Sequence, residues 1–240
     1  MTGDAARFYD DYWRSRDVPR TRARSESRAA LAIALLRRHP PAGAAPRDGS
    51  LRLLELGCGP GFALERFAAA GFDARGIDVS PEAVAAARAR GLRVEAAGLG
   101  DPLPPGPHDV IALLEVLEHL VDPLAVLSRA RLVLAPGGRL LVSLPNELHL
   151  LRRLAVLAGR PGFGGHDDPH LRHFDDHHAR RLFAAADLRV IARASDPLAP
   201  PRRRALRALL RPAARLLPGL LAISNVYLLE PRDGAGAVEL

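Results

Sequence analysis

The sequence predicts an α/β fold in which a mostly parallel sheet is covered by helices on both faces. Two observations lead to this prediction. After residue 50, apolar segments of strand length alternate with segments of helical periodicity, and several junctions between them carry capping or turn residues. A chain of 240 residues is long enough for one such domain with additions at its ends.

Seven short segments have the composition of strands: 51–56, 73–77, 93–96, 109–114, 139–144, 189–193 and 222–229. Helical periodicity lies between them, at 62–70, 81–90, 122–134, 147–158 and 176–186. Residues 135–138, "APGG", are expected to end the helix before them, because proline and glycine do not continue a helix.

Three of the helices have recognisable N-terminal signals. Ser80 and Asp122 are expected to be N-cap residues, and each is followed by a proline at the first helical position. Asp175 and Asp176 are expected to cap the helix that follows them. These signals fix where the predicted helices begin.

The chain divides into four parts by composition. Residues 1–38 are expected to form a helical lid, 39–50 a linker, 51–196 the core, and 197–240 a basic amphipathic helix, a final strand and a flexible tail. The first part carries Tyr9, Tyr12 and Trp13, which either exclude water from a site or pack on the sheet edge. Within the last part, 202–217 is suited to peripheral membrane contact, to dimerisation, or to exposure as a solvated helix.

The net charge of +7 does not by itself indicate a nucleic-acid partner. Every basic residue apart from histidine is arginine, and the arginines are spread over predicted helices without interleaved aromatic residues. The single cysteine, Cys58, excludes an internal disulfide. The sequence shows neither a signal-peptide pattern nor an apolar run of about 20 residues, so we expect a cytoplasmic protein that does not span a membrane.

Three glycines follow the first strand, where a sheet would favour branched apolar residues. Gly57, Gly59 and Gly61 let a ligand approach the backbone at the carboxyl end of that strand. Their G-x-G-x-G spacing differs from the dinucleotide fingerprint, which would need a glycine at position 62. The alternative interpretation of the three glycines is a tight connection between strand and helix that binds no ligand.

Asp78 ends the second strand beside this turn. A carboxylate at that place can accept two hydrogen bonds from a ribose diol. The alternative, a helix cap, is already supplied by Ser80. We therefore expect a nucleoside ligand across the first two strands.

Four motifs in this order and spacing resemble class I S-adenosylmethionine-dependent methyltransferases: "LLELGCGPG", "GIDVSPEAV", "HDVIALLEVLEHLVDP" and "LAPGGRLLVSLPN". The resemblance covers about residues 50–195, and its "LEH" and "PN" details are similar to the small-molecule branch that includes ubiquinone-biosynthesis O-methyltransferases. Residues 145–162 and 170–190 also resemble methyltransferase-like proteins linked to methionine biosynthesis. The resemblance implies a Rossmann-like, doubly wound, seven-stranded sheet of order 3-2-1-4-5-7-6 with the last strand antiparallel, and S-adenosylmethionine as the cofactor.

The resemblance also implies roles for individual residues. Glu55 faces the methionyl amino group, the glycine turn approaches the methionyl moiety, Asp78 holds the ribose hydroxyls, and Val79 lies against the adenine. Gly98 stands where the family often has an acidic residue that reads the adenine amine, so Asp101 or a backbone carbonyl takes that part. The full set implied for the cofactor is Glu55, Gly57, Cys58, Gly59, Gly61, Asp78, Val79, Asp101, Leu114 and Glu115.

Methylation of an oxygen requires a base near the acceptor. Glu115, Glu118 and His119 follow the fourth strand at helical spacing, which predicts that they share one side of a turn. Three roles are open to them: a base, with His119 as the first candidate, ligands for a divalent cation, or a polar turn that organises the loop. We do not expect a metal. Residues 164–178 are rich in histidine and aspartate, but we do not expect a metal there either.

The resemblance places 164–178 over the acceptor pocket, which makes His170 a second catalytic candidate. The residues expected at the substrate are Tyr9, Tyr12, Trp13, Asn146 and His173. The sequence thus indicates methyl transfer from S-adenosylmethionine to a small molecule, first to an oxygen, with nitrogen and carbon as the alternative acceptor atoms, by a monomer or homodimer. The alternatives are a catalytically silent cofactor-binding subunit acting with a partner protein, and a nicotinamide-dependent oxidoreductase.

Overall fold

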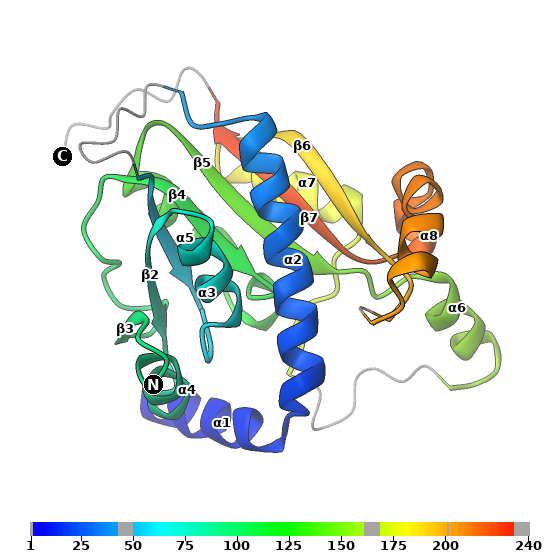
Figure 1. Ribbon diagram of the computed structural model, residues 1–240, viewed down its shortest axis with the longest axis horizontal. Helices are drawn as coiled ribbons and strands as arrows, with labels where there is room; N and C mark the ends of the chain where they lie inside the picture. The colour runs from blue at the N-terminus through cyan, green and yellow to red at the C-terminus, as the bar shows by residue number, and fades with distance from the viewer. Residues whose placement is uncertain (1, 43–49, 161–168, 201, 233–240) are drawn as a thin grey trace.

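The computed structural model describes residues 2–42, 50–160, 169–200 and 202–232 (Figure 1). A seven-stranded sheet of order β3-β2-β1-β4-β5-β7-β6 forms its centre. Neighbouring strands pair in parallel except β7, which runs antiparallel to both β5 and β6. The predicted fold class, strand order and reversed last strand are confirmed. The strands are β1 (Arg52–Leu56), β2 (Asp73–Asp78), β3 (Arg93–Ala96), β4 (His108–Leu114), β5 (Leu134–Pro145), β6 (Leu188–Pro197) and β7 (Ala222–Pro231).

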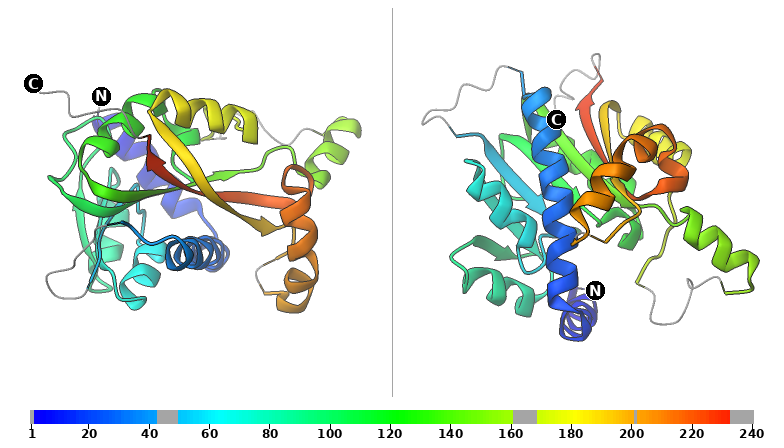
Figure 2. Two further views of the ribbon diagram at one scale, coloured as in Figure 1. Left: turned by 90° about the horizontal axis from the view of Figure 1, so that it is seen from above. Right: turned by 45° about the vertical axis from the view of Figure 1, so that its right-hand side comes forward.

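Helices cover both faces of this sheet, as Figure 2 shows for α2 and α7 on opposite sides. The helices are α1 (Thr2–Ser15), α2 (Val18–Arg38), α3 (Phe62–Ala69), α4 (Pro81–Arg88), α5 (Pro123–Leu132), α6 (Leu150–Leu157), α7 (Asp176–Ala185), α8 (Arg204–Leu216) and α9 (Pro218–Leu221), with a short 3-10 helix at Leu117–His119. Among the residues described, no helix has both the length and the apolar character needed to cross a bilayer.

Two apolar clusters hold these layers together. Alternate residues of a strand point to opposite faces, so Val110 of β4 packs in the cluster beneath α2 and α3, while Ile111 packs in the cluster beneath α5 and α7. Every residue of β4 is buried, which explains why this strand lacks polar alternation. Because the sheet is covered on both faces, its accessible ligand site is at the strand ends.

The N-terminal region differs from the single lid expected over 1–38. It forms two helices, and Asp17 caps the second by accepting the backbone N–H of Arg20 at 3.0 Å. On α2, Ala29, Ala32 and other apolar side chains are buried in the core. Only α1 is therefore free to act as a lid, and α2 belongs to the core.

β7 lies between β5 and β6 in the central sheet, as the predicted strand order requires, so the boundary expected at 196/197 does not separate the final strand from the sheet. Of the predicted linker and tail, residues 43–49 and 233–240 lie outside the described residues.

Two predicted element boundaries are wrong. Residues 135–138 lie within β5, whose pairing with β4 is irregular between His108 and Val110, and Gly137 takes up the irregularity with a φ of +71°. The preceding helix ends at Leu132. The helix expected at 147–158 begins only at Leu150, which leaves Asn146 and Glu147 in the connection that faces the strand ends.

Candidate functional site

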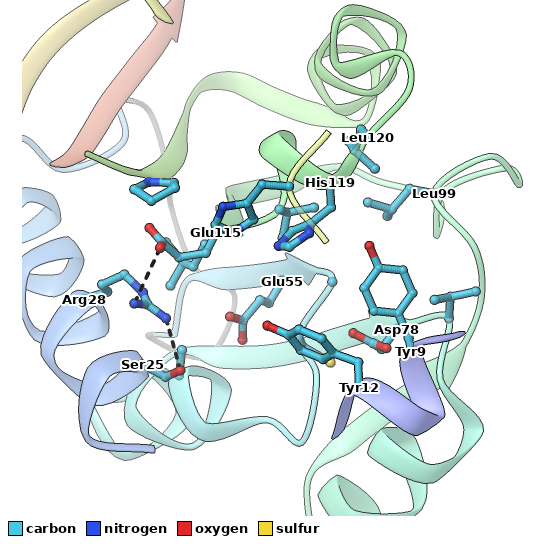
Figure 3. A pocket seen from close by; sticks show the side chains of 18 of the residues that line it. Tyr9, Tyr12, Ser25, Arg28, Glu55, Asp78, Leu99, Glu115, His119 and Leu120 are labelled. Carbon is cyan, nitrogen blue, oxygen red and sulfur yellow. Dashed lines mark hydrogen bonds and ion pairs between the residues drawn. The ribbon is translucent and has the colours of Figure 1, made fainter. Parts of the chain in front are cut away.

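A cavity of about 850 Å³ lies over the carboxyl ends of β1, β2 and β4 and beneath α1 (Figure 3). Strand order reverses between β1 and β4, which is where ligands bind in open α/β sheets. The sequence-predicted residues that line the cavity are Tyr9, Tyr12, Trp13, Glu55, Gly57, Cys58, Asp78, Val79, Leu114, Glu115, His119, Asn146 and His170.

The glycine turn is held against β2 by hydrogen bonds. The N–H groups of Gly57 and Cys58 both donate to the Ile77 carbonyl, at 2.9 and 3.0 Å. Gly59 has a φ of +53°, and the Trp13 ring covers it so closely that an added Cβ would lie 2.4 Å from a ring carbon. Trp13 of α1 therefore packs directly on the turn.

Asp78 fixes the turn and the next helix at the same time. One carboxylate oxygen accepts the Gly59 N–H at 2.7 Å, and the other accepts the Ser80 N–H at 2.9 Å. Ser80 in turn caps α4 by accepting the Ala83 N–H at 3.1 Å, as predicted. Burial raises the pKa of Asp78. Its two oxygens keep lone pairs that can accept further hydrogen bonds at the cavity wall.

Glu55 and Arg28 bring a buried carboxyl group and a guanidinium to the end of β1. Glu55 is 2% exposed, and its Oε2 has no hydrogen-bond partner in the described part of the chain. Burial raises the pKa of Glu55 to about 8. The buried Nε of Arg28 likewise lacks a partner there, while its Nη1 lies 3.8 Å from Glu115. Figure 3 shows both side chains at the cavity.

The three residues predicted to share one side of a turn are arranged differently. Glu115 has a φ of +59°, and its Oε1 accepts hydrogen bonds from the hydroxyls of Ser143 and Ser224 at 3.0 and 2.9 Å. Glu118 is fully buried, and burial raises its pKa well above its usual range. Among the described residues its two oxygens have no partner. The possible ligand atoms of Glu118 lie within 4.8 Å of those of His119 and His170, in a group that does not include Glu115.

His119 is oriented by its Nδ1, which lies 3.0 Å from the Pro169 carbonyl oxygen. A carbonyl only accepts, so Nδ1 carries the proton of the neutral ring and Nε2 keeps a lone pair. Burial lowers the pKa of His119 to about 4, which keeps the ring neutral at physiological pH. The Tyr9 and Tyr12 rings contact it edge-on, with centroids 6.1 and 6.4 Å away.

His170 lies beside His119, with ring centroids 4.9 Å apart. Its Nδ1 is 3.1 Å from a carboxylate oxygen of Glu147, which also pairs with Arg152. A second group of potential metal ligands brings Glu147 and His170 together with His173. Two imidazoles thus lie at one end of the cavity, one oriented by a carbonyl and one by a carboxylate.

Comparison with known proteins identifies the family. The sequence pattern of a family described as "Methyltransferase domain" matches residues 20–193. The chain belongs to this family. Its prediction as a class I S-adenosylmethionine-dependent methyltransferase is confirmed, and S-adenosylmethionine is the cofactor.

Individual relatives are more distant. The ubiquinone biosynthesis O-methyltransferase of Xylella fastidiosa is 38% identical over 122 residues, which are 47% of this chain and 48% of that protein. The chain therefore matches about half the length of this relative. Magnesium protoporphyrin IX methyltransferase from Synechocystis superposes with a TM-score of 0.58 at 16% identity, covering 88% of this chain and 84% of that one. For the CcbJ methyltransferase from Streptomyces caelestis the TM-score is 0.59 at 18% identity, with coverages of 86% and 90%. These structures are similar to this methyltransferase in fold.

The residues at the strand ends fit this cofactor. Glu55 Oε2 and Arg28 Nε, which have no partner among the described residues, complement the ammonium and carboxylate groups of an amino acid. Asp78 has acceptor capacity for a diol, and the backbone of the glycine turn reaches the cavity at Gly57. The sequence did not indicate Arg28 as a site residue. A signal was present, because Arg28 lies four residues before Ala32 and eight before Leu36 and is thus a polar residue on an otherwise buried helix face.

Three of the predicted site residues, Asp101, Asn146 and His173, either lie outside the cavity lining or use their polar groups to hold the backbone. The Asp101 carboxylate accepts the N–H of Gly98 at 2.9 Å, and Gly98 lines the cavity whereas Asp101 does not. His173 is exposed and is not in the lining either. Asn146 does line the cavity, but its amide donates to the Pro218 and Ala222 carbonyls and accepts the Leu148 N–H. Its role in the observed structure is to hold the connection after β5.

Cys58 is buried, and its thiol donates to the Gly59 carbonyl over 3.6 Å. Burial raises its pKa well above the usual value, so the thiol stays protonated. It is a small side chain within the turn rather than a nucleophile. Of the histidine-rich segment, residues 164–168 lie outside the described part of the chain.

Proposed function

We propose that this chain transfers a methyl group from S-adenosylmethionine to an oxygen atom of a small-molecule acceptor. The observation that carries the proposal is the presence of an oriented, neutral imidazole, His119, in the same cavity as Glu55 and Asp78. The name of the Xylella fastidiosa relative, an O-methyltransferase, supports the choice of oxygen.

In this proposal the cofactor lies across the ends of β1 and β2. Glu55 and Arg28 bind the amino-acid end, Asp78 accepts the ribose hydroxyls, and Val79 contacts the adenine. When bound, S-adenosylmethionine supplies an electrophilic methyl group on a sulfonium centre. Gly98 lies at the adenine side, and its N–H already donates to Asp101, so its carbonyl is the backbone group that remains for the adenine.

The acceptor hydroxyl is placed next to His119. Nε2 of His119 takes the proton that the hydroxyl loses, and His170, oriented by Glu147, is the second candidate for this role. A positioned base contributes about 10² to 10⁴ in rate, and the lowered pKa of His119 places it at the lower end of this range. Holding the reacting atoms in line contributes up to about 7 to 11 kcal/mol. Tyr9 and Tyr12 cover this end of the cavity and exclude water from it.

The test is product analysis with isotopically labelled cofactor and a panel of phenols and alcohols. We expect labelled O-methyl products, and we expect His119→Ala to lower turnover about 10²-fold while the affinity for S-adenosylmethionine is unchanged. His177→Ala, an exposed histidine on α7, is the matched control. Addition of EDTA should leave the rate unchanged, since the proposal uses no metal; a rate that returns only with a divalent cation would reassign Glu118, His119 and His170 as its ligands.

Two results would contradict the proposal. Cofactor binding without turnover on any acceptor, together with a stable partner in pull-down, would favour the silent subunit. Normal turnover of the His119 variant would remove this residue from the role of base. A cytoplasmic location and a monomeric or homodimeric state stay predictions from the sequence.

A further inference from the structure

Arg24 is a cation in the cavity wall that the proposed cofactor site does not use. It lies on α2 one turn before Arg28 and is half-buried. Within the described residues, its guanidinium forms no hydrogen bond or ion pair. Burial, and then the nearby positive charges of Arg20 and Arg28, lower its pKa. A cation in this setting lacks the carboxylate that normally accompanies a buried charge.

The carboxylates that act on Arg24 electrostatically are Glu115 and Asp196, and both have closer partners. Glu115 accepts two serine hydroxyls and faces Arg28. Asp196 pairs with the buried guanidinium of Arg207 and accepts a hydrogen bond from Ser27. Neither is therefore the counter-ion of Arg24.

A second donor reaches this part of the cavity from the start of α6. His149 caps α6, and its Nδ1 accepts the backbone N–H of Arg152 at 3.3 Å. The proton of the neutral ring must then be on Nε2, which makes that atom a donor. Burial, and then the positive charges of Arg152 and Arg24, lower the pKa of His149, which keeps its ring neutral. Arg152 itself is neutralised by Glu147 at 2.7 Å.

We propose that Arg24, together with His149, binds an anionic group of the methyl acceptor, a carboxylate or a phosphate. A guanidinium offers two parallel N–H donors to such a group. An anion there would also relieve the repulsion between Arg24 and its cationic neighbours. This inference rests on the proposed function, since it assigns a charge to the acceptor of that reaction.

Arg24 is distinguished from the cofactor site by its surroundings. Arg28 shares the end of β1 with Glu55, whose charge it influences. Arg24 and His149, which precedes α6, line the same cavity as His119 and His170. The anionic group is therefore assigned to the acceptor.

The first experiment measures binding without turnover, in the full chain saturated with S-adenosylhomocysteine. Ligand-observed NMR compares benzoate, phenyl phosphate and the neutral benzamide. We expect benzoate or phenyl phosphate to bind at least about tenfold more tightly than benzamide, and Arg24→Gln to remove that preference. Arg37→Gln, an exposed arginine on the last turn of α2, should keep it. A preference for benzoate assigns a carboxylate, and a preference for phenyl phosphate assigns a phosphate.

Three results would overturn the inference: equal binding of benzamide and both anions, an unchanged preference in Arg24→Gln, or loss of S-adenosylhomocysteine affinity in that variant. The last would place Arg24 in the cofactor site. Circular dichroism and melting of Arg24→Gln and Arg37→Gln establish that both variants are folded.

A second experiment links the site to the reaction. The ratio of kcat/KM for 3,4-dihydroxybenzoate over 3,4-dihydroxybenzamide should exceed about tenfold and approach one in Arg24→Gln. A ratio unaffected by the substitution contradicts the inference. If no phenol or alcohol of the panel is methylated while benzoate still binds through Arg24, the anion site stands and the proposed function fails.

Discussion

Asp78 illustrates how much one side chain does at this site. It closes the glycine turn through Gly59, holds the start of α4 through Ser80, and still faces the cavity. The backbone hydrogen bonds offset part of the cost of its burial. The carboxylate is thus already oriented before a ligand arrives, which lowers the entropy lost on binding.

We predict that Asp78→Ala weakens the binding of S-adenosylmethionine by about 1.5 to 3 kcal/mol, the range for a hydrogen bond to a charged group. Isothermal titration calorimetry measures this directly. Asp101→Ala is the matched control, because that carboxylate contacts Gly98 without lining the cavity, and its effect should be smaller. Unchanged affinity in Asp78→Ala would contradict the proposed placement of the cofactor.

At the scale of residues, the sequence indicates Glu55, Asp78 and His119 because each lies at or just beyond the carboxyl end of a strand, and the carboxyl ends of parallel strands meet at one edge of the sheet. It does not lead to Arg24 or Arg28. These arginines lie on a helix that precedes the sheet, and only the packing of α2 against the sheet turns them toward the cavity. Helical spacing also misplaces Glu115, because its left-handed backbone precedes the short 3-10 helix.

Among the elements, α1 is attached to the rest of the molecule by a few polar contacts at the start of α4. Asp10 accepts hydrogen bonds from the Ser80 hydroxyl and, at 3.2 Å, from the Glu82 N–H. Arg14 pairs with the Glu82 carboxylate at 2.6 Å. Trp13 adds its packing on Gly59. This arrangement closes α1 over the cavity.

We expect Asp10→Ala to loosen α1 while the sheet stays intact. Hydrogen–deuterium exchange should become faster over residues 2–15 and stay unchanged in β1 and β4, because local opening needs less free energy than global unfolding. Turnover should fall with it, since water enters the cavity. Asp4→Ala, which removes only an exposed pair with Arg7, is the control. Equal protection of α1 in both variants would show that Asp10 does not hold it.

The basic helix α8 buries one arginine and exposes several leucines. Arg207 is buried against Asp196, whereas Leu209, Leu216 and Leu217 are exposed at 75%, 81% and 54%. Leu206 and Leu210 are half-buried on the side that the Arg207–Asp196 pair holds at β6, so only part of the apolar side chains of α8 is exposed. Exposed leucines beside arginines suit an anionic lipid surface.

We predict that the protein co-sediments with vesicles of anionic lipid and not with neutral ones. Each arginine near such a surface contributes about 1 kcal/mol. Leu209→Glu should abolish this binding, while Leu132→Glu, at the end of α5, should leave it unchanged. Retention of binding in the Leu209 variant would assign α8 to another role, dimerisation or exposure to solvent.

At the scale of the whole molecule, buried carboxyl groups determine how stability depends on pH. Glu55 keeps its proton in the folded chain up to a pH of about 8 but loses it near 4.5 when unfolded. Between these values the folded state binds the extra proton, so stability falls as pH rises.

In the parent, Glu55 should lower the free energy of unfolding by up to about 1.4 kcal/mol for each pH unit between pH 4.5 and 8. Glu55→Gln should abolish this contribution to the pH dependence. Urea unfolding of the cofactor-free protein across this range provides the measurement. The variant should also bind S-adenosylmethionine more weakly, since an amide cannot pair with an ammonium group. Parallel stability curves for the parent and the variant would show that Glu55 is already ionised in the folded state.

The topology was predictable from sequence because strand and helix signals alternate and the four motifs occur in order. What could not be predicted depends on contacts between distant segments. The extension of β5 back to Leu134 requires pairing with His108, and only the packing of α2 in the core distinguishes it from α1 as a candidate lid. Local preference does not carry this information.

The stretch shared with the family begins at residue 20 and ends at residue 193. Tyr9, Tyr12 and Trp13 from α1, and Ile223 and Ser224 from β7, line the cavity from outside that stretch. Exchange of α1 is therefore expected to change the wall of the cavity while the framework shared with the family stays unchanged.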